Sequence, residues 1–392
     1  MVEAQGGGGG GQAHAWDLQP EGGPAPSRGT PSRGERVQER ADIEVTAEGA
    51  AGIVMLKRPG AGHRLTPAMR AAIAAAVPLW ARNPEIYAFI IGAETSEAFC
   101  SGRDHCELAQ WVASPSTALA ALAEDYALVW ALECFTKPTI SLIDGPVMGS
   151  GVGISLYGTH RVAAEGYAFA MPATHIGFIP DHGVASVLAR MPDEIGVYLA
   201  LTGRSIGRAD AYRLGLATHS IPRRRLGEVR AAISAAEPVD QVLDGLHEDP
   251  GEGELDALAP AIARSFGAAS VEGILARLGE ERGAARDWAR EVALKLERHA
   301  PSALKITLAH VRRARHWDLR ATLIHDFRLA ARCLEGHDFT AGVEALATGS
   351  PVRWRPARLE EVSDQAVAAH FAARPGGELA LASRAEMQAF RR

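Results

Sequence analysis

The chain has 392 residues, of which 47% are hydrophobic, enough apolar side chains for the core of one large domain or of two smaller ones. Its formal net charge of −6 argues against a general nucleic-acid-binding protein, as does the lack of a basic run interleaved with aromatic residues. No segment approaches the roughly 18 consecutive apolar residues of a membrane span.

Residues 1–42 are rich in Gly, Pro, Ser and Arg without a sustained apolar period, which predicts a disordered tail. The first residues lack the basic and apolar regions of a secretory signal, and Glu3, Asp17 and Glu21 are atypical of an organelle transit peptide. The four cysteines form no CxxC pair, which indicates a reducing compartment. A cytoplasmic location is the prediction that follows.

From Ile43 onward, strand and helix patterns alternate. Residues 43–46, 53–56 and 88–91 are predicted strands, and 66–81 is a predicted helix that begins at Thr-Pro. Later segments, for example 260–266 and 271–278, have the spacing of helices. This order predicts an α/β fold in which helices pack on a sheet.

A buried strand predicted at 139–143 leads into a glycine-rich turn, Met-Gly-Ser-Gly-Val-Gly at 148–153, and then into an apolar segment at 154–157. Such a turn presents free backbone N–H groups at the start of a helix. They can bind a phosphate or stabilise the oxyanion of a thioester. The turn alone does not decide between these uses, because glycine-rich turns are common.

A second segment, Phe-Cys-Ser-Gly-Arg-Asp at 99–104, follows the strand at 88–91. Together the two segments resemble the F-C-A-G-G-D and G-G-G loops of the enoyl-CoA hydratase/isomerase (crotonase) superfamily. In that family, one backbone N–H from each loop forms the oxyanion hole for a coenzyme A thioester. The resemblance implies a crotonase-like spiral of ββα units that ends in a helical region.

By motif position, the two donors in this chain are the N–H groups of Arg103 and Ser150. Both lie where the family usually has small residues, so the hole requires that these side chains turn outward. One such donor contributes about 3–4 kcal/mol to transition-state stabilisation. The resemblance also assigns the neighbouring Gly102, Gly149 and Gly151 to substrate binding.

Residues 169–181 are similar to the 3-hydroxyisobutyryl-CoA hydrolase branch, whose pattern is near F-A-M-P-E-T-G-I-G-x-F-P-D-V-G. Further matches follow in the branch's order, at 199–203, 209–219, 301–308, 333–339 and 351–356. The implied organisation is a tail (1–42), a crotonase-like core (43–222), a helical region (223–362) and an extension without an assigned role (363–392).

The chain departs from the branch where the acid–base chemistry lies. The branch uses a Glu and an Asp, which correspond here to Ala173 and Asp181. One acid–base group contributes roughly 10²–10⁴-fold to rate. Asp181 could instead cap a helix that begins near Val184. Hydratases of the superfamily use two glutamates, and both positions, Gly153 and Ala173, lack a carboxylate, so water addition is disfavoured.

Three histidines replace other residues of the family pattern: His105, His175 and His182. A structural role is the commoner outcome for such residues. His175 is the candidate to substitute in part for the Glu missing at Ala173, because an ordinary histidine pKa near 6.5 suits proton transfer at neutral pH. No histidine pair has the helical spacing of a zinc motif, so no metal is predicted.

Two residues of the first loop complete the prediction. Asp104 is expected to support the oxyanion loop, and the resemblance places Asp104 and Ala173 among the substrate-binding residues. The Arg103 guanidinium could reach a substrate carboxylate or a coenzyme A phosphate, or lie in solvent. The leading hypothesis is hydrolysis of a 3-hydroxyisobutyryl-CoA-like thioester, with no cofactor apart from the coenzyme A of the substrate. Asp181 is expected to orient or deprotonate water, or to take part through an anhydride-like intermediate. The alternatives are an acyl-CoA isomerase or lyase and a catalytically impaired acyl-CoA-binding protein. The oligomeric state is left open, although members of the superfamily commonly form trimers or pairs of trimers.

Overall fold

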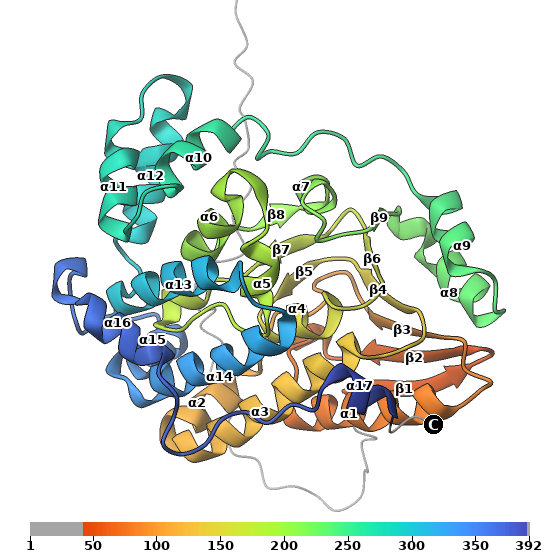
Figure 1. The fold of residues 1–392 in the computed structure, drawn as a ribbon. Helices are drawn as coiled ribbons and strands as arrows, with labels where there is room; N and C mark the ends of the chain where they lie inside the picture. Colours follow the sequence, from red (N-terminus) through yellow and green to blue (C-terminus); the bar gives the residue numbers. More distant parts are fainter. Residues whose placement is uncertain (1–41, 390–392) are drawn as a thin grey trace, which may run out of the picture.

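The computed structural model describes residues 42–389, so the predicted tail, apart from its last residue, lies outside the described part of the chain. A six-stranded sheet forms the centre (Figure 1). Its order is β1 (Ile43–Glu48), β2 (Ala51–Leu56), β3 (Ala88–Ala93), β4 (Thr139–Ile143), β6 (His160–Ala163) and β9 (His219–Ser220). The β1–β2 pair is antiparallel, and every later pair is parallel.

A smaller sheet carries the glycine-rich turn at its edge. It consists of β5 (Pro146–Met148), β7 (Ala168–Ala170) and β8 (Ile206–Gly207), in that order. The turn after β5 leads directly into a helix, so the expected helix at 154–157 begins earlier, at Ser150.

Alternation along β2 explains how the large sheet is covered on both faces. Val54 and Leu56 join the apolar cluster that contains α1 (Pro67–Arg82), whereas Ala51 and Ile53 join the cluster that contains α8 (Leu226–Ser234) and α9 (Val239–Leu246). Successive side chains of a strand point to opposite faces, so helices on both sides bury β2 except for Met55, which is partly buried. Helix α1 begins where Thr66 accepts a hydrogen bond from the N–H of Met69, as the Thr-Pro signal predicts.

The remaining helices before α8 surround the small sheet and the loops. They are α2 (His105–Ala113), α3 (Pro115–Glu133), α4 (Ser150–Ser155), α5 (Val184–Leu188), α6 (Ile195–Thr202) and α7 (Arg208–Arg213), with the 3-10 turn η2 (Ala173–Ile176). The C-terminal helices are α10 (Ala259–Phe266), α11 (Val271–Glu280), α12 (Arg286–Leu296), α13 (Pro301–Ala314), α14 (Leu319–Glu335), α15 (His337–Thr348), α16 (Asp364–Phe371) and α17 (Arg384–Ala389). Helix α14 packs on α3, and α13 packs on α5 and α6 (Figure 1).

The segment after residue 362 folds back onto this helical layer. Leu379 and Leu381 are buried in the same apolar cluster as α3 and α14, and the indole of Trp130 donates a 2.8 Å hydrogen bond to the carbonyl of Ala382. The described part of the extension, up to residue 389, therefore belongs to the packed structure. Among residues 42–389, no helix has the length and apolar character of a membrane span.

Candidate active site

The two glycine-containing loops lie against each other. The N–H of Cys100 donates to the carbonyl of Pro146, and the N–H of Met148 donates to the carbonyl of Cys100, both at 3.0 Å. This bridge brings Gly102 and Gly149 together: a Cβ built on Gly149 would lie 3.6 Å from the Cα of Gly102. Both glycines have positive φ angles, 97° and 48°, which other residues adopt only with strain.

Each loop offers one free backbone donor. Ser150 is the first residue of α4, where an N–H has no acceptor within the helix. Leu65 forms a parallel bridge with Arg103 through the carbonyl of Gly102 and the N–H of Asp104, so the N–H of Arg103 itself faces the other side. Within residues 42–389, neither donor has a protein acceptor. The contact between the loops thus brings together two segments that each carry a free backbone N–H, the type of donor that an oxyanion hole uses.

The side chains of both donors turn inward, contrary to the expectation. The Arg103 side chain is only 7% exposed, pairs with Glu107 at 3.0 Å and with Asp125, and lies 4.0 Å over the ring of Trp111. It is therefore neither in solvent nor available to a coenzyme A phosphate. The Ser150 hydroxyl is also buried, without a hydrogen-bond partner among the described residues.

A second arginine completes a buried network of two arginines and two carboxylates. Arg70, from α1, donates to Glu107 at 2.9 Å and pairs with Asp125. Burial alone would lower the pKa of Arg103, but the charges of Asp125 and Glu107 raise it. The network fixes the loop that carries the Arg103 N–H to α1, α2 and α3.

Asp181 is buried, and both of its oxygens accept hydrogen bonds. The Tyr126 hydroxyl donates to Oδ2 at 2.8 Å, and Nδ1 of His182 lies 2.7 Å from Oδ1. Burial alone would raise the pKa of Asp181, but His182, Tyr126 and the charge of Arg103 together lower it. The carboxyl group is thus held as an anion.

The structure does not show Asp181 as a helix cap. The N-cap of α5 is Gly183, and Asp181 offers the N–H of Val184 only its backbone carbonyl, at 3.3 Å. Asp104, in contrast, does support its loop: its carboxylate accepts from the N–H of Cys106 at 2.9 Å and pairs with Arg58 at 3.0 Å.

His182 is a residue that the sequence did not bring forward as a functional candidate. Its side chain is buried, its backbone has a positive φ of 59°, and its ring packs edge-on against Tyr126 at 5.5 Å between centroids. A Cβ added to Gly153 would lie 2.7 Å from Cδ2 of this imidazole. The one available signal was that a histidine stands directly after Asp181, where the family pattern has valine.

His175 lies elsewhere. It is exposed on η2, and its ring faces that of His299 at 5.6 Å. Partial desolvation of the ring and the charge of Lys295 lower the pKa of His175. The structure thus does not bring His175 to Asp181. Ala173, at the start of η2, is partly buried.

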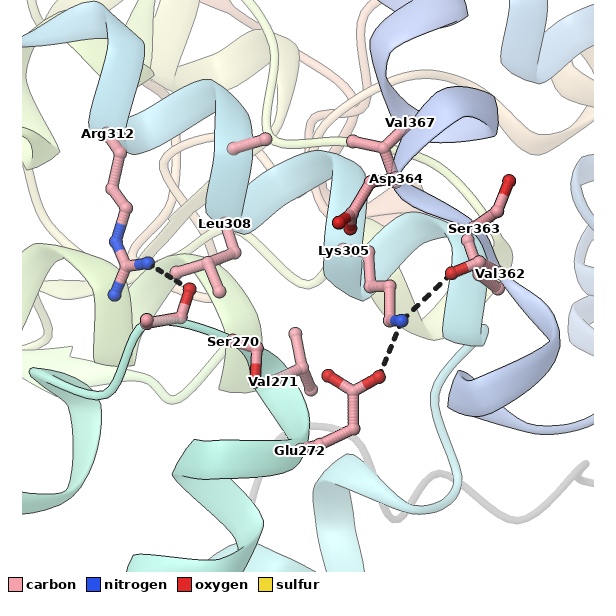
Figure 2. Close-up of a pocket in the computed structure, with 12 residues that line it drawn as sticks. Ser270, Val271, Glu272, Lys305, Leu308, Arg312, Val362, Ser363, Asp364 and Val367 are labelled. Carbon is pink, nitrogen blue, oxygen red and sulfur yellow. Dashed lines mark hydrogen bonds and ion pairs between the residues drawn. The ribbon is translucent and has the colours of Figure 1, made fainter.

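A separate cavity of about 550 Å³ lies between α11, α13 and α16 (Figure 2). Two cations line it, and both are already paired. Lys305 contacts Glu272 and donates to the carbonyl of Val362 at 2.9 Å, and Arg312 donates to the carbonyl of Ala269. None of the predicted site residues lines this cavity. Among residues 42–389, no three His, Cys, Asp or Glu side chains are placed to hold a metal ion.

The enoyl-CoA hydratase/isomerase family model matches residues 51–371 of this chain. The chain belongs to this family. Among curated relatives, the mitochondrial 3-hydroxyisobutyryl-CoA hydrolase of Xenopus tropicalis is 33% identical, over 86% of this chain and 90% of the relative. The Homo sapiens protein of the same name is 32% identical, over 84% of this chain and 88% of that protein.

Other proteins to which the chain is similar carry different names. The small ribosomal subunit protein mS47 of Neurospora crassa is 30% identical, over 79% of this chain and 66% of that protein. The crystal structure of a carnitinyl-CoA dehydratase from Mycobacterium thermoresistibile has a TM-score of 0.82 at 31% identity and covers 87% of this chain and 99% of its own. That of an enoyl-CoA hydratase from Rhodobacter sphaeroides has a TM-score of 0.81 at 32% identity, with 87% and 100% covered.

These comparisons confirm the predicted family and the α/β crotonase fold with its helical C-terminal region. The expected cytoplasmic location receives no support, because the names of the hydrolase relatives place those proteins in mitochondria.

Proposed function

We propose that this protein hydrolyses a coenzyme A thioester of the 3-hydroxyisobutyryl-CoA type. The observation that carries the proposal is the contact between the two loops, which leaves the N–H groups of Arg103 and Ser150 free and close to a buried carboxylate system. Relatives named 3-hydroxyisobutyryl-CoA hydrolase support the same substrate class.

In the proposed reaction the thioester carbonyl oxygen accepts hydrogen bonds from these two N–H groups. Negative charge develops on that oxygen when water attacks, so donors fixed in advance stabilise the transition state more than the ground state. The buried Arg103–Asp125 pair holds one donor, and the close packing of α4 on the Cys100 loop holds the other. Gly102, Gly149 and Gly151 let the two loops approach closely: a Cβ added to Gly151 would lie 2.5 Å from the carbonyl oxygen of Cys100.

Asp181 supplies the carboxylate of the proposed site. It lies close enough to Arg103 for their charges to interact, and its depressed pKa keeps it anionic at neutral pH. An anionic carboxylate can orient water or act through a neighbouring base. His175 lies outside this group and has no part in the proposal.

A second candidate is a family member that binds acyl-CoA but does not turn it over. Ala173 provides no carboxylate, and a protein named as a ribosomal subunit is among the relatives. This candidate predicts tight acyl-CoA binding without release of a thiol.

Thiol release from 3-hydroxyisobutyryl-CoA and a small acyl-CoA panel separates the two candidates. The wild type is compared with Asp181→Ala and with Ala173→Glu, which restores the carboxylate of the hydrolase pattern. Turnover that Asp181→Ala abolishes supports the hydrolase. Absence of turnover in the wild type together with activity in Ala173→Glu supports the non-catalytic candidate, and a changed acyl group without free thiol indicates an isomerase or lyase.

A further inference from the structure

We infer that His182 is the general base of this site and that Asp181 is the residue that positions it. The inference rests on the proposed hydrolysis and names the group that takes the proton from water. The group is needed because Ala173 stands where the hydrolase pattern has its glutamate.

One ring nitrogen of His182, Nε2, has no hydrogen-bond partner among the described residues. Nδ1 lies 2.7 Å from Oδ1 of Asp181, and a carboxylate in that position accepts the Nδ1 proton. In the neutral ring, Nε2 is then an acceptor, and this buried atom has no hydrogen-bond partner among the described residues. A carboxylate on Nδ1 with an Nε2 that has no hydrogen-bond partner is the arrangement in which a histidine serves as general base.

The ring lies beside the helix that carries one oxyanion donor. Gly153 is three residues after Ser150 in α4, and residues with this spacing share a helix face. Because a Cβ at Gly153 would lie 2.7 Å from Cδ2 of His182, the imidazole fills the space on that face. The ring of His182 therefore occupies the space that a side chain at position 153 would need. This space lies one helical turn from the N–H of Ser150.

The surroundings hold the ring from several elements. From α3, Tyr126 packs on the ring and Asp125 lies with Oδ2 3.9 Å from Nε2. After α4, the Tyr157 hydroxyl donates to the backbone carbonyl of His182 at 2.7 Å. From α14, Asp326 accepts the N–H of the next residue, Gly183, at 2.6 Å. These contacts hold the positive φ of His182, a strained conformation of the kind found at functional sites.

The proposed step balances without a further reactant. Nε2 accepts a proton as the oxygen of water forms a bond to the thioester carbon, and the carbonyl electrons move to the oxygen bound by Arg103 and Ser150 N–H. When that oxygen re-forms the double bond, the carbon–sulfur bond breaks. The imidazolium returns its proton to the leaving sulfur, which yields the free acid and the thiol of coenzyme A.

His182→Asn is the decisive variant. The asparagine amide can still donate to Asp181, as Nδ1 does, and asparagine tolerates a positive φ, but it has no group equivalent to Nε2. We expect thiol release from 3-hydroxyisobutyryl-CoA or the responding acyl-CoA to fall about 10²–10⁴-fold in kcat, with KM and the melting temperature close to those of the wild type. His316→Asn, at an exposed histidine of the described chain, is the matched control.

The dependence of kcat on pH distinguishes the two roles of His182, because the loss of a purely structural residue would leave the shape of the pH profile unchanged. The wild type should lose activity at low pH as the base is protonated, and His182→Asn should lack this limb. Added imidazole should restore activity to His182→Ala. A His182→Asn protein with wild-type kcat and the same pH limb overturns the inference and leaves the proposed hydrolysis standing. Absence of thiol release from the wild type overturns both.

Discussion

The hydroxyl of Tyr126 donates a 2.8 Å hydrogen bond to Oδ2 of Asp181, and both side chains are buried. The bond joins α3 to the loop before α5, two elements whose positions are far apart in the sequence. It also helps to keep the Asp181 carboxyl ionised, because burial alone would favour the neutral form. Tyr126 thus connects the stability of the fold to the charge at the site.

Tyr126→Phe should lower the free energy of unfolding by about 1.5–3 kcal/mol at pH 7, the typical contribution of a hydrogen bond to a charged group. The folded-state pKa of Asp181 is depressed, so its stabilisation is present above the unfolded pKa of about 4 and is lost as pH falls through the folded value. The folded pKa of Asp181 in the variant is higher and therefore closer to the unfolded value, so the variant should lose less stability than the wild type as pH falls.

Denaturant unfolding of both proteins between pH 3 and pH 7 measures this difference. The difference in free energy of unfolding between the wild type and Tyr126→Phe should become smaller toward pH 3, because the Asp181 carboxyl becomes protonated in both proteins. Tyr212→Phe, at an exposed tyrosine, is the control and should show no such pH dependence. A gap that stays constant over the whole range would contradict the link to Asp181.

Arg103→Met should destabilise the protein by about 3–5 kcal/mol, because it leaves Asp125 and Glu107 buried with one fewer cation. Methionine retains much of the packing against Trp111 without the charge. Thermal and denaturant unfolding report the change. Arg358→Met removes a cation from an exposed pair on the surface and should have no measurable effect; equal stability of the two variants would show that the buried network contributes little.

The sequence predicted the backbone of this site better than its side chains. The glycine spacing in both loops led to the prediction of donors at Arg103 and Ser150, and the structure leaves both N–H groups without an acceptor among residues 42–389, because a backbone N–H depends on chain geometry alone. The sequence did not predict the partners of the Arg103 side chain. Its partner Glu107 is one helical turn away, but Asp125 belongs to another helix and meets it only in the folded chain.

The histidines illustrate the same limit. His175 was favoured because it is close in sequence to Ala173, yet its ring faces that of His299, which lies between α12 and α13 in the C-terminal helical region. His182 was passed over, although it is bonded to Asp181 and packs on Tyr126. In loops and 3-10 turns the side chains do not alternate with a fixed period. Two residues that are close in sequence can therefore point in different directions.

Leu381→Ala should lower the free energy of unfolding by about 2–4 kcal/mol, within the range for a buried leucine. Leu381 is 6% exposed, and its carbonyl accepts a hydrogen bond from Arg320 of α14, so the extension after residue 362 contributes to the helical layer. Leu346→Ala, at a leucine that is 40% exposed, is the matched control. Unfolding by denaturant compares the two, and a loss no larger than that of the control would mean that the extension is dispensable for stability.

Gly153→Ala should destabilise the protein by about 1–3 kcal/mol, the usual effect of overpacking, because the new methyl group meets the ring of His182. The matched control is Gly227→Ala in α8, where an added Cβ has no neighbour within 4 Å and alanine favours the helix, so stability should be kept or increased. Because the clash is with the imidazole, Gly153→Ala combined with His182→Ala should cost less than the sum of the two single changes, and a double-mutant cycle measures that difference. Strict additivity would mean that the side chain at position 153 and the imidazole do not share this space. Coupling of 1 kcal/mol or more would place the histidine on the face of α4 that begins at the Ser150 donor.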